Sequence, residues 1–507
     1  MGIDSRRIAK NTIFLYARML LTMGVTLYTS RVVLEVLGAD DYGLYFTIFS
    51  VIGMLSFLNG TLSGGTSRFI TFELGKGNLE AQKSTFSTAL YTHILLAILI
   101  IIIGETGGLY YAYNVLKVPE TQRHAAVIVY QISVFTTILS IIQIPFSADI
   151  IAHERMNVYA YLGIYEAAAK LAVVYFLVNT PYVKIILYAL LQAGVSISLF
   201  IFYICYCKYN FKEVNLAKRF DKAIFISMLG FSGWNLLANI SNTLSRQGVI
   251  MLFNYFFSPI VVAAQAVSNQ ISTAAGQFIN NIRTAVNPQI IKLYAEGEEL
   301  QSQTLTLKSA EYFYYLLLLI GVPCIMVMPR LLSIWLKNVP EYAVPFAQLM
   351  VIQLILDNFN AAFYTPMMAA NKMSKNAIWA SILIGLQFFL TWLIFHLGFG
   401  PLWARYLAII SVSVLSFVIK PYILIKEINY PINKITKCLW DCAKISIPII
   451  AINIFIYLAI PQTSLGYSIL VAFFSFFSVL TCSYISVGPT IRQKVHKLVL
   501  NYFGKFK

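Results

Sequence analysis

The fold is decided by segments of one kind, the clearest of which is TFSTALYTHILLAILIIIIG, residues 85–104. This segment contains no Asp, Glu, Lys or Arg. An α-helix rises about 1.5 Å per residue, so about 20 apolar residues cross the hydrocarbon core of a bilayer. Residues 85–104 are therefore predicted to form a membrane-spanning helix.

The same criterion applied along the chain gives fourteen candidate spans, and it predicts an all-α polytopic membrane protein. The span over 443–460 is the weakest because Pro448 and Pro461 bracket it. The candidates are 11–34, 43–66, 85–104, 125–147, 158–178, 183–206, 224–252, 261–285, 310–328, 343–369, 377–397, 402–425, 443–460 and 465–487.

The composition agrees with many spans and excludes most soluble functions. Of 507 residues, 59% are hydrophobic and 11% are charged, whereas a soluble domain has about 25% charged residues. This composition excludes a cytosolic enzyme, a nucleic-acid-binding protein and a disordered scaffold. The six cysteines match neither a disulfide framework nor a zinc-ligand pattern, and we expect free thiols.

Basic residues are distributed unevenly between alternate loops. If the N-terminus is cytoplasmic, cytoplasmic segments hold 25 of the 37 Lys and Arg residues, five of them in 420–444, and the opposite loops hold six. Because cytoplasmic loops carry the excess of Lys and Arg, we expect both termini in the cytoplasm. The first apolar run continues to about Gly38 without a cleavage site, so it is predicted to be a span and not a signal peptide.

The basic loop over 208–222 divides the spans into six and then eight. Arg31 and Arg68 recur 215 residues later as Arg246 and Arg283, which indicates a duplicated unit. Halves that both start from the cytoplasm are related by an axis along the membrane normal, as in some transporters. The predicted domains are a six-helix bundle over 1–222, a second over 223–426, and two additional helices with a basic tail over 427–507.

Ionisable side chains inside spans are costly unless they are paired or face water, so each is a candidate functional residue. Six cations and two acids lie there, and a positive interior suits an anionic cargo because guanidinium groups bind phosphate in a bidentate manner. The cations are Arg18, Arg31, Arg68, Lys170, Arg246 and Arg283, and the acids are Glu166 and Asp357.

The position of each arginine along its span affects its interpretation. Arg31 and Arg68 lie near span ends, where they either line a cavity or extend to lipid headgroups. Arg18 lies about 10 Å beyond Asn11 along a helix, and this depth favours a position facing a cavity.

Glu166, Lys170 and Asp357 are the candidates for coupling transport to a proton or sodium gradient. Glu166 precedes Lys170 by four residues, a spacing that favours a structural ion pair over a transport site. Asp357 has no obvious partner nearby in the sequence. It is either a protonatable coupling residue or a hydrogen-bonded structural residue.

Polar residues at steps of three and four form stripes on one face of two consecutive spans. Such faces avoid lipid. They either hydrogen-bond between helices or line a hydrated lumen, and two adjacent arginine-bearing stripes favour the lumen. Glycines between 59 and 65 predict a bend at this cavity. The stripes are Ser232, Asn235, Asn239, Asn242 and Arg246, then Gln265, Asn269, Ser272, Gly276, Asn280, Arg283 and Asn287.

Four segments in combination resemble the polysaccharide/O-antigen flippase (Wzx-type) family of the multidrug/oligosaccharidyl-lipid/polysaccharide exporter (MOP) superfamily. They are RIAKNTIFLYARMLLTMGVTLYTSRVVLEVLGADDYGLYF at 7–46, SRFITFELGKGN at 67–78, SADIIAHERMN at 147–157 and TPMMAANKMSKN at 365–376. The resemblance extends over the whole chain. It implies two six-helix bundles around a central cavity, in a bacterial cytoplasmic (inner) membrane.

The resemblance also implies a cargo, an undecaprenyl-diphosphate-linked oligosaccharide that moves from the cytoplasmic to the periplasmic leaflet by alternating access. In related peptidoglycan-precursor flippases, arginines of the first, second and eighth helices bind the diphosphate. The residues on comparable helices here are Arg18, Arg31, Arg68 and Arg283. With Arg246, the expected lumen residues are Asn235, Asn239, Asn242, Asn269 and Asn280.

Two other functions within the superfamily stay open, an organic-cation exporter and a peptidoglycan-precursor flippase. The first usually needs embedded carboxylates, which cations outnumber here. We expect no enzymatic activity because the outer loops are short and carry no paired carboxylates or metal-ligand cluster. We expect no cofactor apart from an ion gradient. The expected partners are the lipid-linked oligosaccharide, membrane lipids and polysaccharide polymerase machinery, with the protein as a monomer and no nucleic acid.

Overall fold

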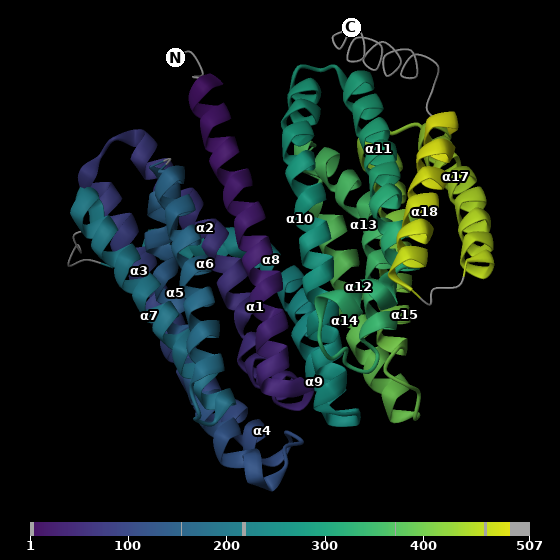
Figure 1. Ribbon diagram of the computed structural model, residues 1–507. Coiled ribbons are helices and arrows are strands. Elements are labelled where there is room, and N and C mark those ends of the chain that lie inside the picture. Colours follow the sequence, from purple (N-terminus) through teal and green to yellow (C-terminus); the bar gives the residue numbers. More distant parts are fainter. Residues whose placement is uncertain (1–4, 154, 215–219, 371, 461–463, 487–507) are drawn as a thin grey trace, which may run out of the picture. The chain divides into compact units, whose positions relative to one another are not determined.

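The computed structural model describes residues 5–153, 155–214, 220–370, 372–460 and 464–486 (Figure 1), and every element among them is helical. The earlier helices are α1 (Ser5–Gly53), α2 (Ser56–Lys76), α3 (Leu79–Ile103), α4 (Leu109–Asn114), α5 (Glu120–Ala152), α6 (Met156–Asn179), α7 (Lys184–Asn210), α8 (Lys222–Thr243) and α9 (Val249–Phe256). The later helices are α10 (Pro259–Ala295), α11 (Glu299–Met326), α12 (Met328–Trp335), α13 (Ala343–Ala369), α14 (Met373–His396), α15 (Trp403–Val414), α16 (Lys420–Ile428), α17 (Ile432–Ala459) and α18 (Leu465–Ser486). Shorter turns are the π turns η1 (Gly104–Gly108), η3 (Leu244–Gly248) and η4 (Leu415–Ile419), and the 3₁₀ turn η2 (Lys212–Val214).

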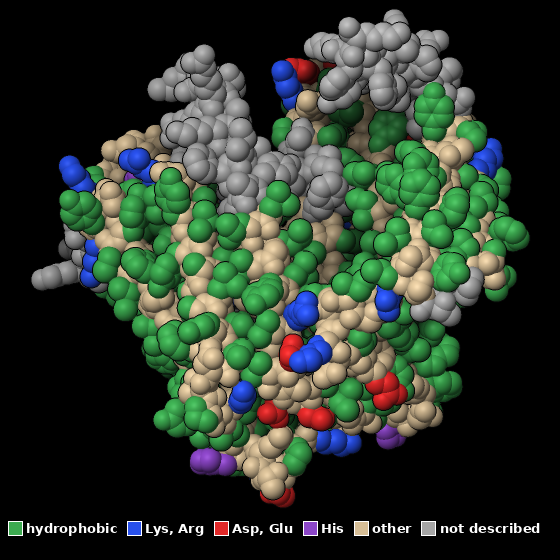
Figure 2. Space-filling model, in the orientation of Figure 1, with side chains coloured by type: hydrophobic (Ala, Val, Ile, Leu, Met, Phe, Trp, Pro, Cys, Tyr) green, Lys and Arg blue, Asp and Glu red, His purple; other side chains and the backbone are tan. Residues whose placement is uncertain are grey.

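The chain is a multi-pass membrane protein, and eleven helical runs of its described part are long and apolar enough to cross a membrane. Hydrophobic side chains cover most of the visible face in Figure 2. Leu458, for example, is 78% exposed on α17, where lipid would cover it at no cost. The helix α10 is not among the eleven because its polar stripe lowers its mean hydropathy. The count of fourteen spans therefore stays a prediction.

The residues cluster into two compact units. The first unit comprises Met1–Gln270, Leu336–Ala343 and Ala380–Ala404, and the second comprises Ile271–Trp335, Val344–Trp379 and Arg405–Lys507. These two units are defined by which residues lie close together in space, and not by the duplicated pattern in the sequence. The domain boundaries at residues 222 and 426 remain a prediction about the repeat.

In the first unit, α5 is the central helix and packs against α2, α3 and α7, while α1 packs against α6. A buried apolar cluster fills one end of this group of helices. Phe86 of α3 and Phe146 of α5 meet edge to face at 5.4 Å, and Phe211 and Val214 close the cluster from the segment after α7. This packing holds η2 against α3 and α7, and it brings Glu213 of η2 to His153, which directly follows α5.

In the second unit, α11 packs against α17 and α18, which also pack against each other. The hydroxyl groups of Tyr314 and Ser446 lie 2.7 Å apart, and Asn453 donates to Ser478 Oγ at 3.0 Å. The predicted span over 443–460 is part of α17, which continues through Pro448. Membrane helices tolerate such prolines because neighbouring groups satisfy the freed carbonyl.

The motif LGADDYGLY at 37–45 owes its two glycines to geometry. Gly38 interrupts α1 with a φ of 78°, a conformation that favours glycine. Gly43 faces the start of α10 so closely that an added Cβ would overlap the carbonyl group of Pro259. The first predicted span therefore ends at Gly38, and the next helical segment packs backbone to backbone on α10.

The bend predicted at the glycines between 59 and 65 is wrong. The helix α2 continues without interruption from Ser56 to Lys76, and the chain breaks earlier, between Gly53 and Ser56. Glycine costs about 1 kcal/mol in a helix exposed to water. In lipid no water competes for the backbone hydrogen bonds, so a glycine-rich segment stays helical.

We expect Gly43→Ala to lower the stability of the protein by about 1–3 kcal/mol, because a backbone carbonyl cannot move aside as a flexible side chain can. Thermal unfolding in detergent measures the effect. Gly24→Ala is the matched control, since Gly24 lies in the part of α1 before Gly38 and a Cβ there would meet nothing within 4 Å. Equal melting temperatures for the two variants would contradict the proposed close contact.

Candidate functional site

A buried polar cluster in the second unit surrounds α13 between residues 356 and 360. Arg283 of α10 is only 8% exposed, and its Nη2 donates to Asn358 Oδ1 at 2.9 Å. Asn358 in turn donates through Nδ2 to the carbonyl oxygen of Ala310 on α11, at 2.8 Å. The guanidinium also lies 5.6 Å from the centre of the Phe313 ring. Arg283 is thus held by groups from two neighbouring helices.

Lys420 supplies a second buried cation to this cluster. It is 4% exposed, and its Nζ donates to the carbonyl oxygen of Asn360 at 2.6 Å and lies 5.2 Å from the Tyr364 ring centre. The π turn η4 directly precedes it, and Ser416 of that turn donates to the carbonyl oxygen of Leu356 at 3.1 Å. Turns of this kind often occur at functional positions in membrane and soluble helices.

Asp357 contributes the opposing charge. Its Oδ1 accepts a hydrogen bond from Asn360 Nδ2 at 2.7 Å, and it interacts electrostatically with Arg283 and Lys420. Two basic side chains and one acidic one thus come together where the effective dielectric constant is low. This arrangement can attract an anion.

The sequence predicts Arg283 and Asp357 in this region, but it misses Lys420. The structure corrects the count that assigns Lys420 to the basic loop over 420–444, because this lysine is buried within a continuous helical run. A signal is present in the sequence, since Lys420 lies inside the predicted span over 402–425. Asp357, for which the sequence suggests no partner, is hydrogen-bonded.

In the first unit, the predicted arginines that can be described lie on the surface. Arg31 of α1, Arg68 of α2 and Arg246 of η3 are all exposed. The side chain of Arg18 lies outside the described part, as do those of Asn235 and Asn280. Whether these residues face a cargo stays a prediction.

The polar stripe at the start of α10 makes hydrogen bonds within the first unit. Gln265 donates to Asn269 Oδ1 at 2.8 Å, and Gln270 donates to the hydroxyl of Tyr42 on α1 at 3.0 Å. Asn239 is half-buried and Asn242 is exposed, and both have contacts of their own. Gln270 lies beside the stripe, but Asn287 belongs to it and accepts from Thr365 Oγ1 of α13 at 3.0 Å. Part of the stripe therefore joins helices, which is one of the two interpretations that the sequence leaves open.

Glu166 and Lys170 form the predicted intrahelical pair, with Lys170 Nζ 2.6 Å from Glu166 Oε1. Both side chains are partly exposed. Glu166 also lines a polar cavity of about 240 Å³, together with Gln143, Ser147 and Tyr203. The pair is confirmed, and a role for Glu166 in ion coupling stays a prediction.

No protein-family model matches the chain, and no curated protein matches it at a significant level. Solved structures do match. The lipid II flippase MurJ in an inward closed conformation gives a TM-score of 0.66 at 12% identity, covering 94% of this chain and 98% of that one.

Two structures of multidrug resistance MATE family transporters of the MOP superfamily also match. The inward-facing one gives a TM-score of 0.65 at 14% identity, covering 80% of this chain and 96% of that one. The outward-facing one gives 0.58 at 13% identity, covering 81% and 93%. The chain therefore has the fold of these transporters.

We expect Asn358→Leu to destabilise the protein more than Asn453→Leu does. Asn358 accepts from a charged guanidinium and donates to a carbonyl, whereas Asn453 bonds only neutral groups. Hydrogen bonds to charged groups contribute about 1.5–3 kcal/mol, against about 0.5–1.5 for neutral ones. Unfolding followed with a thiol-reactive dye in detergent compares the two variants, and an equal loss would show that Asn358 does not hold Arg283.

Proposed function

We propose that this protein is a flippase that moves an undecaprenyl-diphosphate-linked oligosaccharide from the cytoplasmic to the periplasmic leaflet by alternating access. The observation that carries the proposal is the buried cluster in which Arg283 and Lys420 face the single carboxylate of Asp357. A diphosphate is the part of such a cargo that a positive excess in a low-dielectric site attracts.

The identity of the cations supports a phosphate ligand over other anions. The planar guanidinium of Arg283 has five donors in a fixed fork, and Asn358 and Phe313 already orient it. Lys420 adds a compact charge that binds phosphate oxygens without a fixed direction. We propose that Arg18 and Arg68 meet the diphosphate in the inward-facing state and that Arg31 and Arg246 receive it in the outward-facing state.

The sugar part of the cargo needs partners of a different kind. We propose that the amide side chains of the two polar stripes bind the hydroxyl groups, while the polyprenyl chain stays in lipid between helices. The fold supports alternating access, because MATE transporters with this fold have been solved in both inward-facing and outward-facing conformations. The same fold occurs in MurJ, a lipid II flippase.

A second candidate is an organic-cation exporter, and one observation favours it. Glu166 lines the polar cavity of the first unit, where a carboxylate suits a cationic drug. Lys170 already neutralises this carboxylate at 2.6 Å, however, so the cavity offers no net negative charge from the pair. The anionic cargo therefore agrees better with the buried groups.

Reconstitution into liposomes with two cargoes separates these functions. A labelled polyprenyl-diphosphate oligosaccharide reports leaflet exchange, and a fluorescent organic cation reports drug transport. We expect exchange of the first cargo only. Transport of the cation alone would overturn the flippase, and exchange of a peptidoglycan precursor in preference to other oligosaccharides would redefine its cargo.

In the same assay we expect Arg283→Gln to slow exchange by about tenfold or more, since a charge-assisted hydrogen bond of about 1.5–3 kcal/mol is lost. The exchange rate of Arg283→Lys should lie between those of the wild type and Arg283→Gln, because lysine keeps the charge but lacks the planar guanidinium with its fixed donors. Arg123→Gln is the control, as Arg123 pairs with Glu120 at a partly exposed position. Unchanged exchange by folded Arg283→Gln protein would remove the basis of the proposal.

We expect Asp357→Asn to abolish the stimulation of exchange by a proton or sodium gradient while exchange without a gradient continues. The amide keeps the hydrogen-bonding shape but can neither lose a proton nor attract a cation. The liposome assay with and without each gradient measures this difference. Normal stimulation in the variant would assign coupling elsewhere, with Glu166 the next residue to test.

A further inference from the structure

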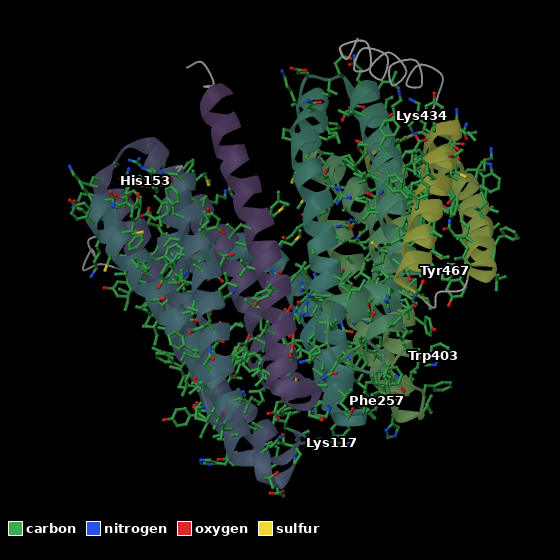
Figure 3. The ribbon with its side chains drawn as sticks, in the orientation of Figure 1. Lys117, His153, Phe257, Trp403, Lys434 and Tyr467 are labelled. Carbon is green, nitrogen blue, oxygen red and sulfur yellow. The ribbon has the colours of Figure 1, made fainter. Side chains whose placement is uncertain are left out.

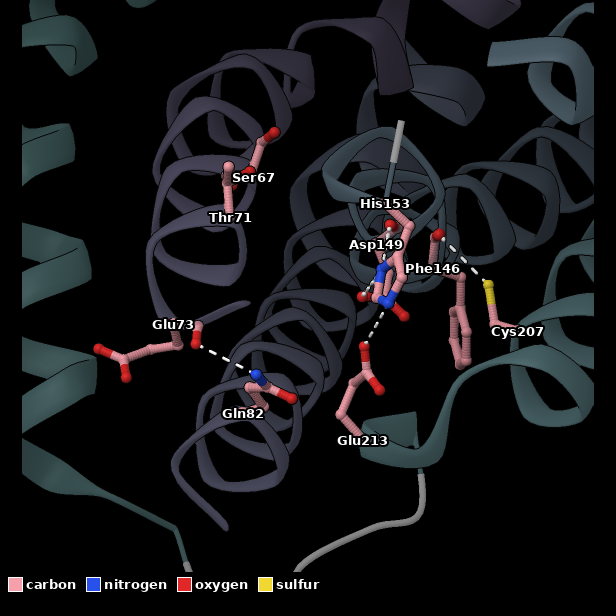
Figure 4. A network of polar contacts seen from close by, with 9 residues as sticks. All are labelled: Ser67, Thr71, Glu73, Gln82, Phe146, Asp149, His153, Cys207 and Glu213. Atoms are coloured by element: carbon pink, nitrogen blue, oxygen red, sulfur yellow. Dashed lines mark hydrogen bonds and ion pairs between the residues drawn. The ribbon is translucent and has the colours of Figure 1, made fainter. Parts of the chain in front are cut away.

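Three metal-binding residue types meet in the first unit, remote in the sequence from the cluster around Arg283. Asp149 lies in the last turn of α5, His153 directly follows that helix at one end of it (Figure 3), and Glu213 lies in η2. One ligand atom from each residue lies within 4.8 Å of the other two. Figure 4 shows the imidazole between the two carboxylates.

Both carboxylates are buried without the hydrogen bonds that burial normally requires. Asp149 is fully buried, and neither of its carboxylate oxygens accepts a hydrogen bond from any residue that the structure describes. Glu213 is 4% exposed, and its Oε1 likewise accepts none within the described part. Buried acceptors almost always have a partner, because an unpaired acceptor loses its hydrogen bonds to water and gains none within the protein.

One nitrogen of the His153 ring bonds the backbone, and the other faces Glu213. His153 Nδ1 lies 3.2 Å from the backbone carbonyl oxygen of Asp149, a contact in which the ring N–H donates. The ring stacks on Phe211 with centroids 4.0 Å apart, which fixes its orientation. With the proton on Nδ1, the lone pair of Nε2 points toward Glu213 Oε1 at 3.1 Å. A histidine metal ligand is oriented in this way, by a hydrogen bond from its second nitrogen to a carbonyl group.

We propose that Asp149, His153 and Glu213 bind a divalent transition-metal ion of the Zn²⁺ class. One imidazole nitrogen and two carboxylate oxygens form a donor set that suits Zn²⁺ better than Mg²⁺ or Ca²⁺, which prefer oxygen ligands throughout. A divalent ion balances the charge of both carboxylates beside a neutral imidazole. A single proton on His153 would balance only one and would leave Asp149 with no donor.

The distances fit a site that closes slightly on binding. Ligand atoms in tetrahedral zinc sites lie about 3.3 Å apart, as follows from bonds of about 2.0–2.1 Å. Here Nε2 and Glu213 Oε1 are 3.1 Å apart, and one ligand atom from each of the three residues lies within 4.8 Å of the other two. The His153 side chain is 25% exposed, so an ion can enter from the surface and water can supply a fourth ligand.

The bound ion would fasten the end of α5 to the connection between α7 and α8. That connection already attaches to the first unit at its far end, where the backbone N–H of Asp221 donates to Thr88 Oγ1 at 3.1 Å and the Asp221 side chain caps α8. Because the ion binds the folded arrangement only, it stabilises the protein in proportion to its occupancy. The site does not depend on the proposed flippase function.

Metal binding to the full-length protein in detergent tests the proposal, with an affinity tag that contains no histidine. After chelation and dialysis, the probe is Co²⁺, followed by its visible absorption and then displaced by Zn²⁺. We expect one ion per chain and a rise of several degrees in melting temperature. His153→Asn and Glu213→Gln should each weaken binding by more than about 100-fold, since loss of a supporting outer group alone costs about 10–100-fold.

His124→Asn and Glu80→Gln are the matched controls, because both residues are exposed. Asp149→Asn completes the series if it folds, and the first two variants suffice if it does not. Binding that persists in His153→Asn and Glu213→Gln would overturn the proposal. So would a wild-type protein that neither binds Co²⁺ nor gains stability with Zn²⁺, a result that would assign a protonated His153 to the cluster instead.

Discussion

Hydrocarbon offers no hydrogen bonds, and this constraint governs both the backbone and the polar side chains of the chain. Each backbone N–H and C=O within a span must be satisfied inside the protein, which is why the described residues form helices and why α2 and α17 continue through glycines and a proline. The same constraint acts on side chains. A buried Arg283 therefore requires Asn358, and Asn358 requires the carbonyl group of Ala310. Polar groups inside the membrane thus occur as connected clusters.

The two polar clusters differ in what they lack. Around α13, Asn360 donates to Asp357, and Lys420 donates to the carbonyl oxygen of Asn360, so two basic groups and one acid share hydrogen-bonded surroundings. At the end of α5, both carboxylate oxygens of Asp149 and the Oε1 atom of Glu213 accept no hydrogen bond from the described residues. The low dielectric constant of the interior makes both features, the grouped basic side chains and the unpaired carboxylate oxygens, energetically significant. On the two proposals above, the first cluster binds an anion transiently during transport, and the second holds a cation permanently.

Much of the fold follows from the sequence, because hydropathy and spacing are local properties. Residues 85–104 predict α3, and the spacing of Glu166 and Lys170 predicts their pair. What the sequence does not predict depends on packing between distant segments. From the sequence alone, Lys420 counts among the loop residues, whereas in the structure it is buried in the helical run around η4. The pairing of Asp149 with Glu213 is equally remote, although the spacing of Asp149 and His153 by four residues places that pair on one helical face.

The glycines of the LGADDYGLY motif show why such a sequence pattern indicates a fold more firmly than it indicates a cargo. Gly38 is required by a backbone conformation, and Gly43 by the proximity of Pro259, and neither requirement involves a ligand. A cargo must instead be recognised by side chains, and on the proposed function these are the buried Arg283 and Lys420 together with the carboxylate of Asp357.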